Sequence, residues 1–352
     1  MDAGYGWDNE GRMTSLSYPC PGCTPATAAF TYDAMSNLTG LTDAANGATA
    51  SATYGPAGEI DTLTYSDYPN PGYSEGFTYN NLWQLTRMTA TSGSSTVLDQ
   101  QYIFPTGQNN GRISRMIDNG VGETVDYTYD KLNRLSTAAA TNGAWGQSYS
   151  YDGFGNLNAK TVTAGSAMHL SVSFDANNHQ VGVNYDANGN ALTTPDGYLA
   201  NYDAENRLVG TNRTDQNGCG ANYSYDPQGK RLLTETVCPV GNGQYSYGYA
   251  LSFYGINGKI LATGSATSSP NQAFQLTTVS PVPVDFGNIK YGGQVTDRLG
   301  TVRNGTMYSY FSVGRAAHQQ HRARVHLHPR RLRTGLRRST LLCEYVWQVF
   351  NA

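Results

Sequence analysis

The chain has 352 residues, of which only 14% are charged, and its formal net charge is −3 at pH 7. Gly accounts for 40 residues, and Tyr outnumbers Phe by 26 to 10. This composition disfavours a helical protein and favours turns and strands, with Tyr suited to sheets whose faces meet water. No apolar run approaches the ~20 residues of a membrane-spanning helix, and no N-terminal stretch resembles a signal peptide.

A pattern recurs along the chain roughly every 22 residues. An aromatic residue precedes Asp, two or three small or polar residues follow, and Gly or Asn then leads into Arg or Asn and an aliphatic residue. The clearest copies lie at 30–41, 127–137, 149–159, 184–194, 201–211 and 223–234, and weaker ones at 7–13, 77–88, 173–181 and 253–261. The central pairs of the clear copies are Tyr32 and Asp33, Tyr129 and Asp130, Tyr151 and Asp152, Tyr185 and Asp186, Tyr202 and Asp203, and Tyr225 and Asp226.

Each copy predicts a β-hairpin. Tyr223 and Tyr225 alternate with Ser, which places both rings on one face of a strand. Residues 226–229, Asp-Pro-Gln-Gly, have turn chemistry, because Asp accepts hydrogen bonds from nearby amides and Gly tolerates positive φ. Residues 230–234 then return as the second strand.

The fold class that follows is all-β, with antiparallel hairpin repeats in one continuous winding sheet. A single hairpin is marginally stable in water, so each copy must pair with its neighbours. The Ser-, Thr- and Gly-rich tracts at 90–96 and 263–269 are expected to be long surface loops. Two Pro residues within 278–284 predict an edge strand or a connection.

The Asp residues also invite a catalytic interpretation, with paired carboxylates acting as acid and base. Nearly all of them occupy the same turn position, however, where local backbone hydrogen bonds account for them. Before residue 315 the chain has only His169 and His179, so no Ser-His-Asp or Cys-His set is suggested. We therefore expect no enzyme, no cofactor and no metal.

Cysteine spacing leaves two alternatives open. Cys219 and Cys238 flank the hairpin at 226–230 almost symmetrically, which fits either a cross-strand disulfide or two reduced neighbours. Cys20 and Cys23 have the spacing of a redox motif or half a zinc site, but no second pair completes four ligands. A loop disulfide or inert thiols are expected there.

These repeats resemble those of the RHS/YD-repeat family, which includes polymorphic toxins, toxin-complex shells and teneurin-like adhesion proteins. Residues 295–303, Val-Thr-Asp-Arg-Leu-Gly-Thr-Val-Arg, are similar to the TDRLGSVR signature of the RHS-associated core. The core-signature residues are Asp297, Arg298, Leu299, Gly300 and Arg303. The resemblance implies a non-catalytic spiral β-shell that, in intact toxin relatives, encloses and delivers a C-terminal polypeptide toxin from a secreted or cell-surface protein.

The resemblance also implies three regions: a repeat array at 1–290, the start of the core segment at 291–314, and a basic tail at 315–352. The tail has eight Arg and one acid, so it carries about +7 and the remainder about −10. Its sequence is expected to be out of frame or disordered, and the start of the chain inside a repeat is expected to reflect truncation.

The expected partners are a polypeptide cargo or the remainder of a shell, with glycans as a further possibility and without nucleic acid or a membrane span. Two other functions stay open at this point. Exposed Tyr rings could bind carbohydrate in a cell-surface adhesion protein. Alternatively, the chain could be a degraded gene product without independent function.

Overall fold

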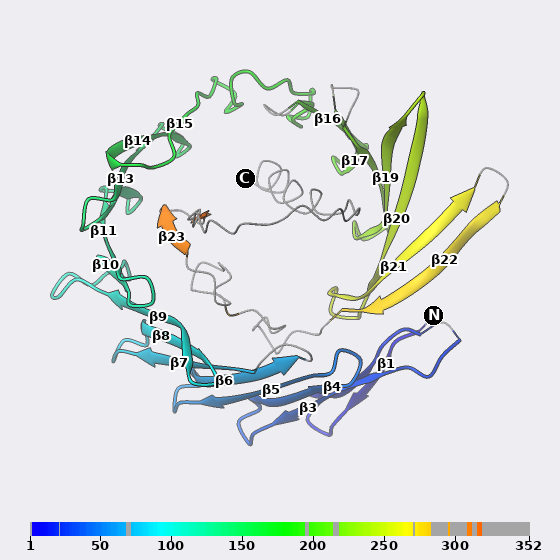
Figure 1. The fold of residues 1–352 in the computed structure, drawn as a ribbon, viewed down its shortest axis with the longest axis horizontal. Helices are drawn as coiled ribbons and strands as arrows, with labels where there is room; N and C mark the ends of the chain where they lie inside the picture. Colours follow the sequence, from blue (N-terminus) through cyan, green and yellow to red (C-terminus); the bar gives the residue numbers. More distant parts are fainter. Residues whose placement is uncertain are drawn as a thin grey trace, which may run out of the picture.

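The computed structural model describes residues 2–20, 22–67, 72–193, 197–213, 218–269, 272–282, 295, 308–311 and 315–318. Within these ranges the chain is entirely β-structure and turns, which confirms the predicted fold class. Figure 1 shows the strands following one another around a ring with a central space.

Three antiparallel sheets contain the strands in sequence order. The first sheet consists of β1 (Gly4–Trp7), β2 (Met13–Ser17), β3 (Thr27–Tyr32), β4 (Leu38–Asp43), β5 (Ala48–Tyr54), β6 (Ile60–Asp67), β7 (Tyr73–Tyr79), β8 (Leu85–Ser92), β9 (Ser95–Ile103), β10 (Arg115–Asp118), β11 (Glu123–Tyr129), β12 (Leu135–Ala140), β13 (Trp145–Tyr151), β14 (Leu157–Gly165) and β15 (Leu170–Ser171). The second consists of β16 (Tyr198–Tyr202), β17 (Leu208–Arg213), β18 (Gly220–Tyr225), β19 (Arg231–Gly241), β20 (Gln244–Tyr254), β21 (Ile260–Ser269) and β22 (Gln272–Pro281). The third pairs β23 (Tyr308–Phe311) with β24 (Arg315–His318).

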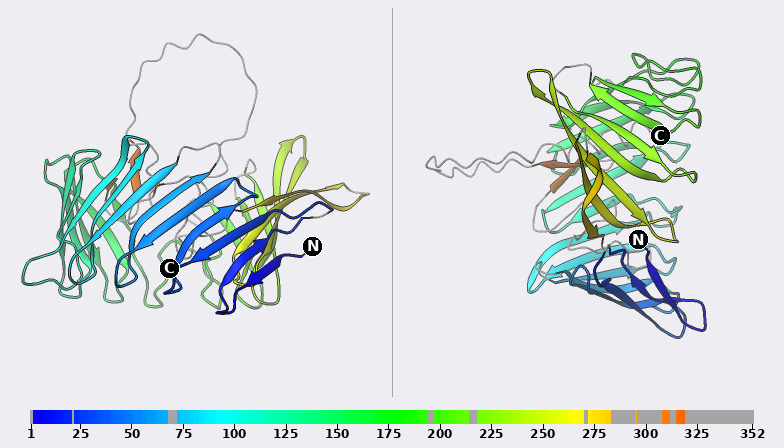
Figure 2. Two further views of the ribbon diagram at one scale, coloured as in Figure 1. Left: turned by 90° about the horizontal axis from the view of Figure 1, so that it is seen from below. Right: turned by 90° about the vertical axis from the view of Figure 1, so that its right-hand side faces the viewer.

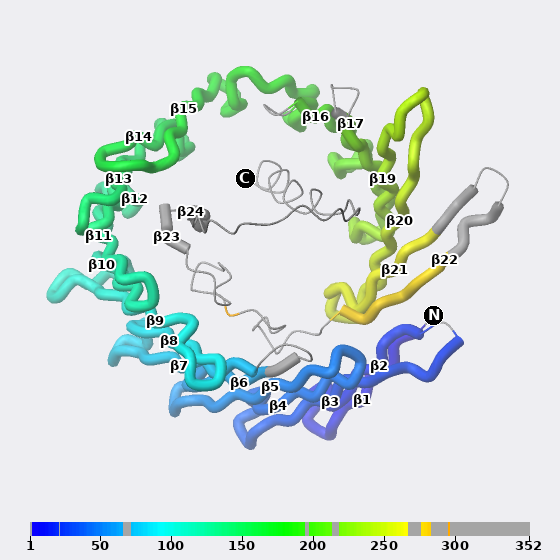
Figure 3. Tube along the Cα trace, in the orientation of Figure 1, coloured from blue at the N-terminus to red at the C-terminus, as the bar shows by residue number. Residues whose placement is uncertain are grey.

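The two large sheets are separated by the stretch between β15 and β16. Its described part contains three isolated bridges, which are Phe174 with Gln180, Tyr185 with Ala191, and Thr193 with Leu199. Backbone hydrogen bonds still join successive passes, since the amide of Val172 donates to Asn158 and that of Ala200 donates to Leu192. The hairpin order therefore continues around the ring although the strands shorten to single bridges (Figure 3).

Burial alternates along the strands of the first sheet, as a sheet with one covered face requires. In β5, for example, Ala48, Ala50 and Ala52 are buried and the residues between them are exposed. The buried side chains form one cluster that runs from β2 to β13 and also contains Leu261 of β21 and Val295. Leu261 thus contributes to the same core as strands more than 200 residues earlier.

The ring closes where β1 meets the turn between β20 and β21 (Figure 1). The backbone amide of Ile256 donates a hydrogen bond of 3.2 Å to the Tyr5 hydroxyl. Tyr5 also packs against the core cluster to which Leu261 belongs. One circuit of the sheet therefore takes the chain from about residue 5 to residue 256.

Two predicted loops are strands instead. The 90–96 tract lies in β8 and β9, joined by a turn at Gly93 and Ser94, and the 263–269 tract lies in β21. These tracts are rich in Thr, whose branched Cβ favours extended backbone, so composition alone was a misleading guide. Residues 278–281 belong to β22, which is the edge strand of the second sheet.

Candidate functional site

The Tyr-Asp turns form the most regular feature of the molecule, and Asp130 illustrates their geometry. Its Oδ1 accepts hydrogen bonds from the amides of Leu132 and Arg134, both at 2.9 Å. Its Oδ2 accepts one from Arg134 Nε at 2.7 Å. The Asp130 amide donates to the Arg134 carbonyl, and the Asn133 amide donates back to the Asp130 carbonyl. Asn133 takes positive φ (65°), which completes a three-residue hairpin loop with a bulge.

The same two backbone bonds to the side chain recur at the other turns. They form at Asp8, Asp33, Asn80, Asp152, Asp175, Asp186, Asp203 and Asp226. At Asp33, Asp152 and Asp186 the carboxylate also accepts a side-chain amide bond from Asn four residues later, which lowers the pKa of each Asp. All six predicted turn carboxylates thus accept hydrogen bonds from backbone amides of their own turns.

The Tyr before most of these turns joins its repeat to the preceding one. The hydroxyl of Tyr151 donates to the Leu135 carbonyl at 2.9 Å, and Leu135 begins the return strand of the preceding hairpin. Equivalent bonds run from Tyr32 to Met13, Tyr54 to Leu38, Tyr129 to Ile113, Tyr202 to Ala191, Tyr225 to Leu208 and Tyr254 to Arg231. Tyr185 differs: its hydroxyl accepts from the Gln180 amide, and its ring stacks on His179 at 4.1 Å.

A cation at the end of one turn covers the Tyr ring of the next. Arg134 bonds Asp130 of its own turn, and its guanidinium lies 4.4 Å from the centre of the Tyr151 ring. Arg12 over Tyr32 and Arg207 over Tyr225 repeat this arrangement. The role of these Arg residues was not predicted, although a basic residue four positions after Asp was visible in the pattern.

The Tyr151→Phe variant is expected to lower the free energy of unfolding by about 1 kcal/mol, because it removes one hydrogen bond between repeats and leaves the Leu135 carbonyl without its hydroxyl donor. Tyr247→Phe is the matched control, since this side chain is 56% exposed on β20. Urea unfolding of both variants measures the difference. Equal loss in the two variants would contradict a linking role for the Tyr151 hydroxyl.

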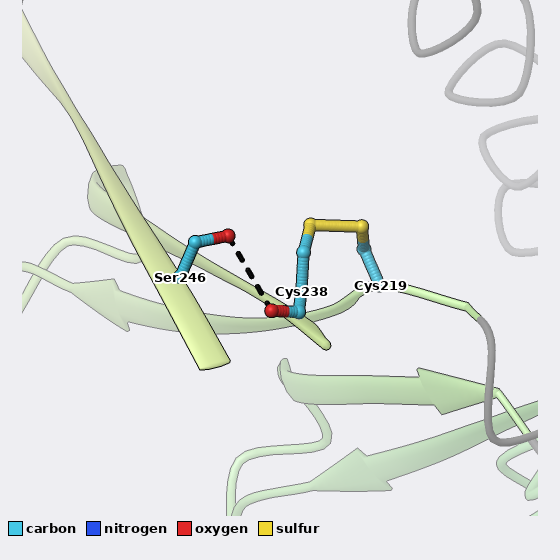
Figure 4. Close-up of a disulfide and its surroundings, with 3 residues drawn as sticks. All are labelled: Cys219, Cys238 and Ser246. Atoms are coloured by element: carbon cyan, nitrogen blue, oxygen red, sulfur yellow. Dashed lines mark hydrogen bonds between the residues drawn. A yellow bond between two sulfur atoms is a disulfide. The ribbon is translucent and has the colours of Figure 1, made fainter. Parts of the chain in front are cut away.

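Four cysteines form two disulfides in the structure. Cys219, directly before β18, is bonded to Cys238 of β19, with their Cα atoms 4.2 Å apart (Figure 4). The carbonyl of Cys238 also accepts a hydrogen bond from Ser246 Oγ on β20. Cys20 and Cys23 form the second bond, with Cα atoms 5.5 Å apart.

Buried acidic side chains line the covered face of the first sheet, which sequence patterns did not reveal. Each bonds a neutral donor: Asp43 accepts from Tyr18, Glu75 from Tyr65, Asp118 from Gln100, and Glu123 from Trp145. Burial raises the pKa of Glu75 to about 7, and the Tyr65 hydroxyl bond opposes this in part. Among the described residues, no three His, Cys, Asp or Glu side chains are grouped to hold a metal ion.

A shallow cavity of about 570 Å³ lies where the connection between β9 and β10 replaces a Tyr-Asp turn. Two of its polar side chains are already engaged: Asn109 exchanges hydrogen bonds with Gln84, and Arg87 forms two with Asp99.

The core-signature residues Asp297, Arg298, Leu299, Gly300 and Arg303 lie outside the described residues, as does the tail from 319 onward. The regional boundaries predicted at 290 and 314 therefore stay predictions. The part of the chain that the structure covers contains no helix of the length and hydrophobicity needed to cross a membrane.

No family model matches the chain. Two curated relatives are similar to about a third of it: the tRNA nuclease WapA of Bacillus subtilis is 36% identical over 126 residues, and the tRNA3(Ser)-specific nuclease WapA of Bacillus spizizenii is 37% identical over 113. These matches cover 33% and 30% of the chain and 5% of each relative. The chain thus spans a small fraction of the length of the relatives it matches.

Solved structures of Tc toxins are similar in fold. The Photorhabdus luminescens Tc holotoxin pore matches with a TM-score of 0.52 at 14% identity, covering 87% of this chain and 19% of the toxin chain. The TcdB2-TccC3 structure without its hypervariable C-terminal region matches with a TM-score of 0.51 at 14% identity, covering 84% and 19%. Identity this low shows a common fold alone. The chain therefore has an all-β repeat fold shared with part of these Tc toxin structures.

Proposed function

We propose that the chain is a non-catalytic wall segment of an RHS-repeat shell, and that this wall encloses a polypeptide cargo. The observation that carries the proposal is the ring itself, in which strands follow in sequence order and the Ile256 amide closes on Tyr5. A sheet that curves around a central space has the shape of a container wall. The fold likeness to Tc toxin structures and the partial identity to WapA support RHS membership and a secreted or cell-surface setting.

The turn contacts supply the stiffness that a wall needs. The Tyr151 hydroxyl and its equivalents, and the Arg residues over the Tyr rings of following turns, join one hairpin to the next. Around the stretch between β15 and β16, Asn side chains also join one turn to the next. The amide of Asn156 donates to Asn178, and that of Asn190 donates to Asn206. The rim of the wall is thereby held together where strand pairing is reduced to bridges.

Protease protection tests the proposal. A tagged, unfolded casein fragment is co-expressed with the full chain, and digestion of the tag is followed over time. We expect its half-life to increase at least tenfold in the presence of the chain, because a protease cannot reach an enclosed polypeptide. A fragment digested equally fast with and without the chain would argue against a shell.

Two variants locate the effect. Tyr5→Ala removes the hydroxyl that receives the Ile256 amide and should reduce protection by opening the ring. Tyr247→Ala changes an exposed side chain of β20 and should leave protection unchanged. If both variants lose protection, or if neither does, protection of the cargo does not depend on ring closure.

A further inference from the structure

His179 occupies a position of the repeat at which three other turns have Arg. It stands four residues after Asp175, as Arg12, Arg134 and Arg207 stand four residues after the Asp of their own turns. An imidazole side chain gains or loses its charge in roughly the range pH 5 to 8, whereas a guanidinium stays charged. The position is therefore filled here by a group whose charge depends on pH.

In its own turn the imidazole points toward Asp175 without bonding it. Nδ1 of His179 lies 3.9 Å from Oδ2 of Asp175, which is beyond hydrogen-bonding distance. In the comparable turn, Arg134 Nε donates to Asp130 Oδ2 at 2.7 Å. The backbone of the two turns is held in the same way, because Asp175 Oδ1 accepts from the amides of Asn177 and His179, both at 2.9 Å. The missing bond is thus a property of the side chain and not of a different turn.

The imidazole also contacts the turn that follows. The His179 ring stacks on Tyr185, with the ring centres 4.1 Å apart and the planes at 11°. This contact repeats that of Arg134 with Tyr151, in which the residue at the end of one turn covers the Tyr ring of the next. Nε2 of His179 also faces the following turn, since a Cβ added to Gly189 would lie 3.7 Å from it. His179 therefore holds the place of a linking cation between two repeats.

The stretch that contains His179 has few other contacts to hold it. Between β15 and β16 the strand pairing is reduced to isolated bridges. None of the residues 170–193 is buried, and no described residue between 168 and 260 belongs to the hydrophobic core cluster. In Figure 1 and in the right view of Figure 2, this stretch, in green, lies across the ring from the blue strands β3 to β5. Local opening is expected to be easier here than in the first sheet, so one added contact should change it measurably.

The turns around His179 carry acids and no cation. Its own turn has Asp175, the turn before has Asp152 and the turn after has Asp186, and none of the three turns contains Lys or Arg. Side-chain amides of Asn lower the pKa of Asp152 and of Asp186, so both stay ionised through the range in which histidines titrate. Tyr185 is the titratable side chain of the following turn that touches the imidazole. A charged imidazole therefore meets attraction from these turns and no repulsion.

We propose that His179 is a pH-sensitive link between the two large sheets, and that it tightens when its imidazole takes up a proton. The protonated ring has an N–H at both nitrogens, so Nδ1 can donate to Asp175, and its charge turns the stack on Tyr185 into a cation–π contact. The unfolded chain lacks both contacts. The added stability is therefore present at acidic pH and is lost as the pH rises through the range in which histidines titrate. The link acts on the ring itself and does not depend on what the ring encloses.

Hydrogen exchange of the full chain, followed by mass spectrometry, tests this link. Exchange is measured at about pH 5.5 and about pH 7.5, and each rate is compared with the intrinsic rate of a free amide at the same pH, which gives a protection factor. The peptides of interest cover 172–193, where the Val181 amide donates to Ser173 and the Leu192 amide donates to Asn184. We expect their protection factors to be about threefold higher at the lower pH.

Three variants assign the effect to one side chain. His179→Arg carries a permanent charge, so the segment should show the higher protection at both pH values. His179→Phe keeps a ring beside Tyr185 but cannot take up a proton, so it should show the lower protection at both. His169→Phe is the matched control, because it makes the same change at an exposed histidine of the same region, and it should keep the pH dependence of the parent chain.

Two results would overturn the proposal. One is equal protection of 172–193 in the parent chain at both pH values, and the other is a pH dependence that persists in His179→Phe. The titration of Glu75 is distinguished by its place, because its effect is expected in β6 to β8 and should remain in every variant. Peptides from β3 to β5 show whether each variant keeps the first sheet.

Discussion

Replacing Glu75 with Gln is expected to stabilise the chain at pH 8 by about 3 kcal/mol and to leave its stability at pH 4 unchanged. Burial raises the pKa of Glu75 from 4.5 to about 7, so the folded chain binds this proton more tightly than the unfolded chain. The stability that it contributes is present below pH 4.5 and is lost as the pH rises through about 7. Gln keeps an acceptor for the Tyr65 hydroxyl and carries no charge to desolvate.

Urea unfolding at pH 4, 6 and 8 measures this difference. The parent chain should lose stability between pH 4 and 8, and the Glu75→Gln variant should lose much less. Glu205→Gln provides the control, because the Glu205 carboxylate lies on an exposed turn tip. This variant should show the same dependence of unfolding free energy on pH as the parent chain. A parent chain that becomes more stable from pH 5 to 8, with no change in the variant, would contradict this assignment.

Removing the disulfide between Cys219 and Cys238 is expected to destabilise the β18–β19 hairpin by about 3 kcal/mol, through the extra freedom of the uncrosslinked chain. Among the described residues, β18 pairs with β17 only at Gly210 with Asn222 and Thr211 with Ala221, so the covalent link to β19 is expected to matter for this strand. The Cys219→Ser, Cys238→Ser variant should therefore exchange the backbone amide hydrogens of β18 faster, while those of β3 to β5 stay protected.

Hydrogen exchange followed by mass spectrometry resolves these segments. The control is Cys20→Ser, Cys23→Ser, which opens a loop of sequence separation 3 instead of 19 and should cost about 2 kcal/mol. Its effect should be confined to the connection between β2 and β3. Unchanged exchange in β18 after loss of the Cys219–Cys238 bond would show that strand pairing alone holds this hairpin.

The hairpins could be predicted from sequence because each turn is specified within a few residues. Asp130, for example, needs only the amides of Leu132 and Arg134 to complete its turn. The reduced strands at 172–193 could not be foreseen as readily. Asp175 and Asp186 follow each other closely, which leaves too few residues between their turns for two full strands.

The buried acids could not be predicted either, since their burial depends on distant parts of the chain. Glu75 in sequence is one of many polar residues in a strand, and nothing local distinguishes the covered face at that point. The exposed apolar side chains at the turn tips were visible in principle, because Met35, Leu132 and Phe154 occupy one position of the repeat. That they lie on one rim of the first sheet became evident only with the strand order.

Strand order has a kinetic consequence. Within the two large sheets each strand pairs with its neighbours in the chain, so a hairpin closes a loop of only a few residues and adds to the strand before it. The bond between Tyr5 and Ile256 is different, because 251 residues separate its partners. A chain that emerges end first, from a ribosome or a secretion channel, can therefore build most of this wall as it appears, and the ring is sealed only after its last hairpins have formed.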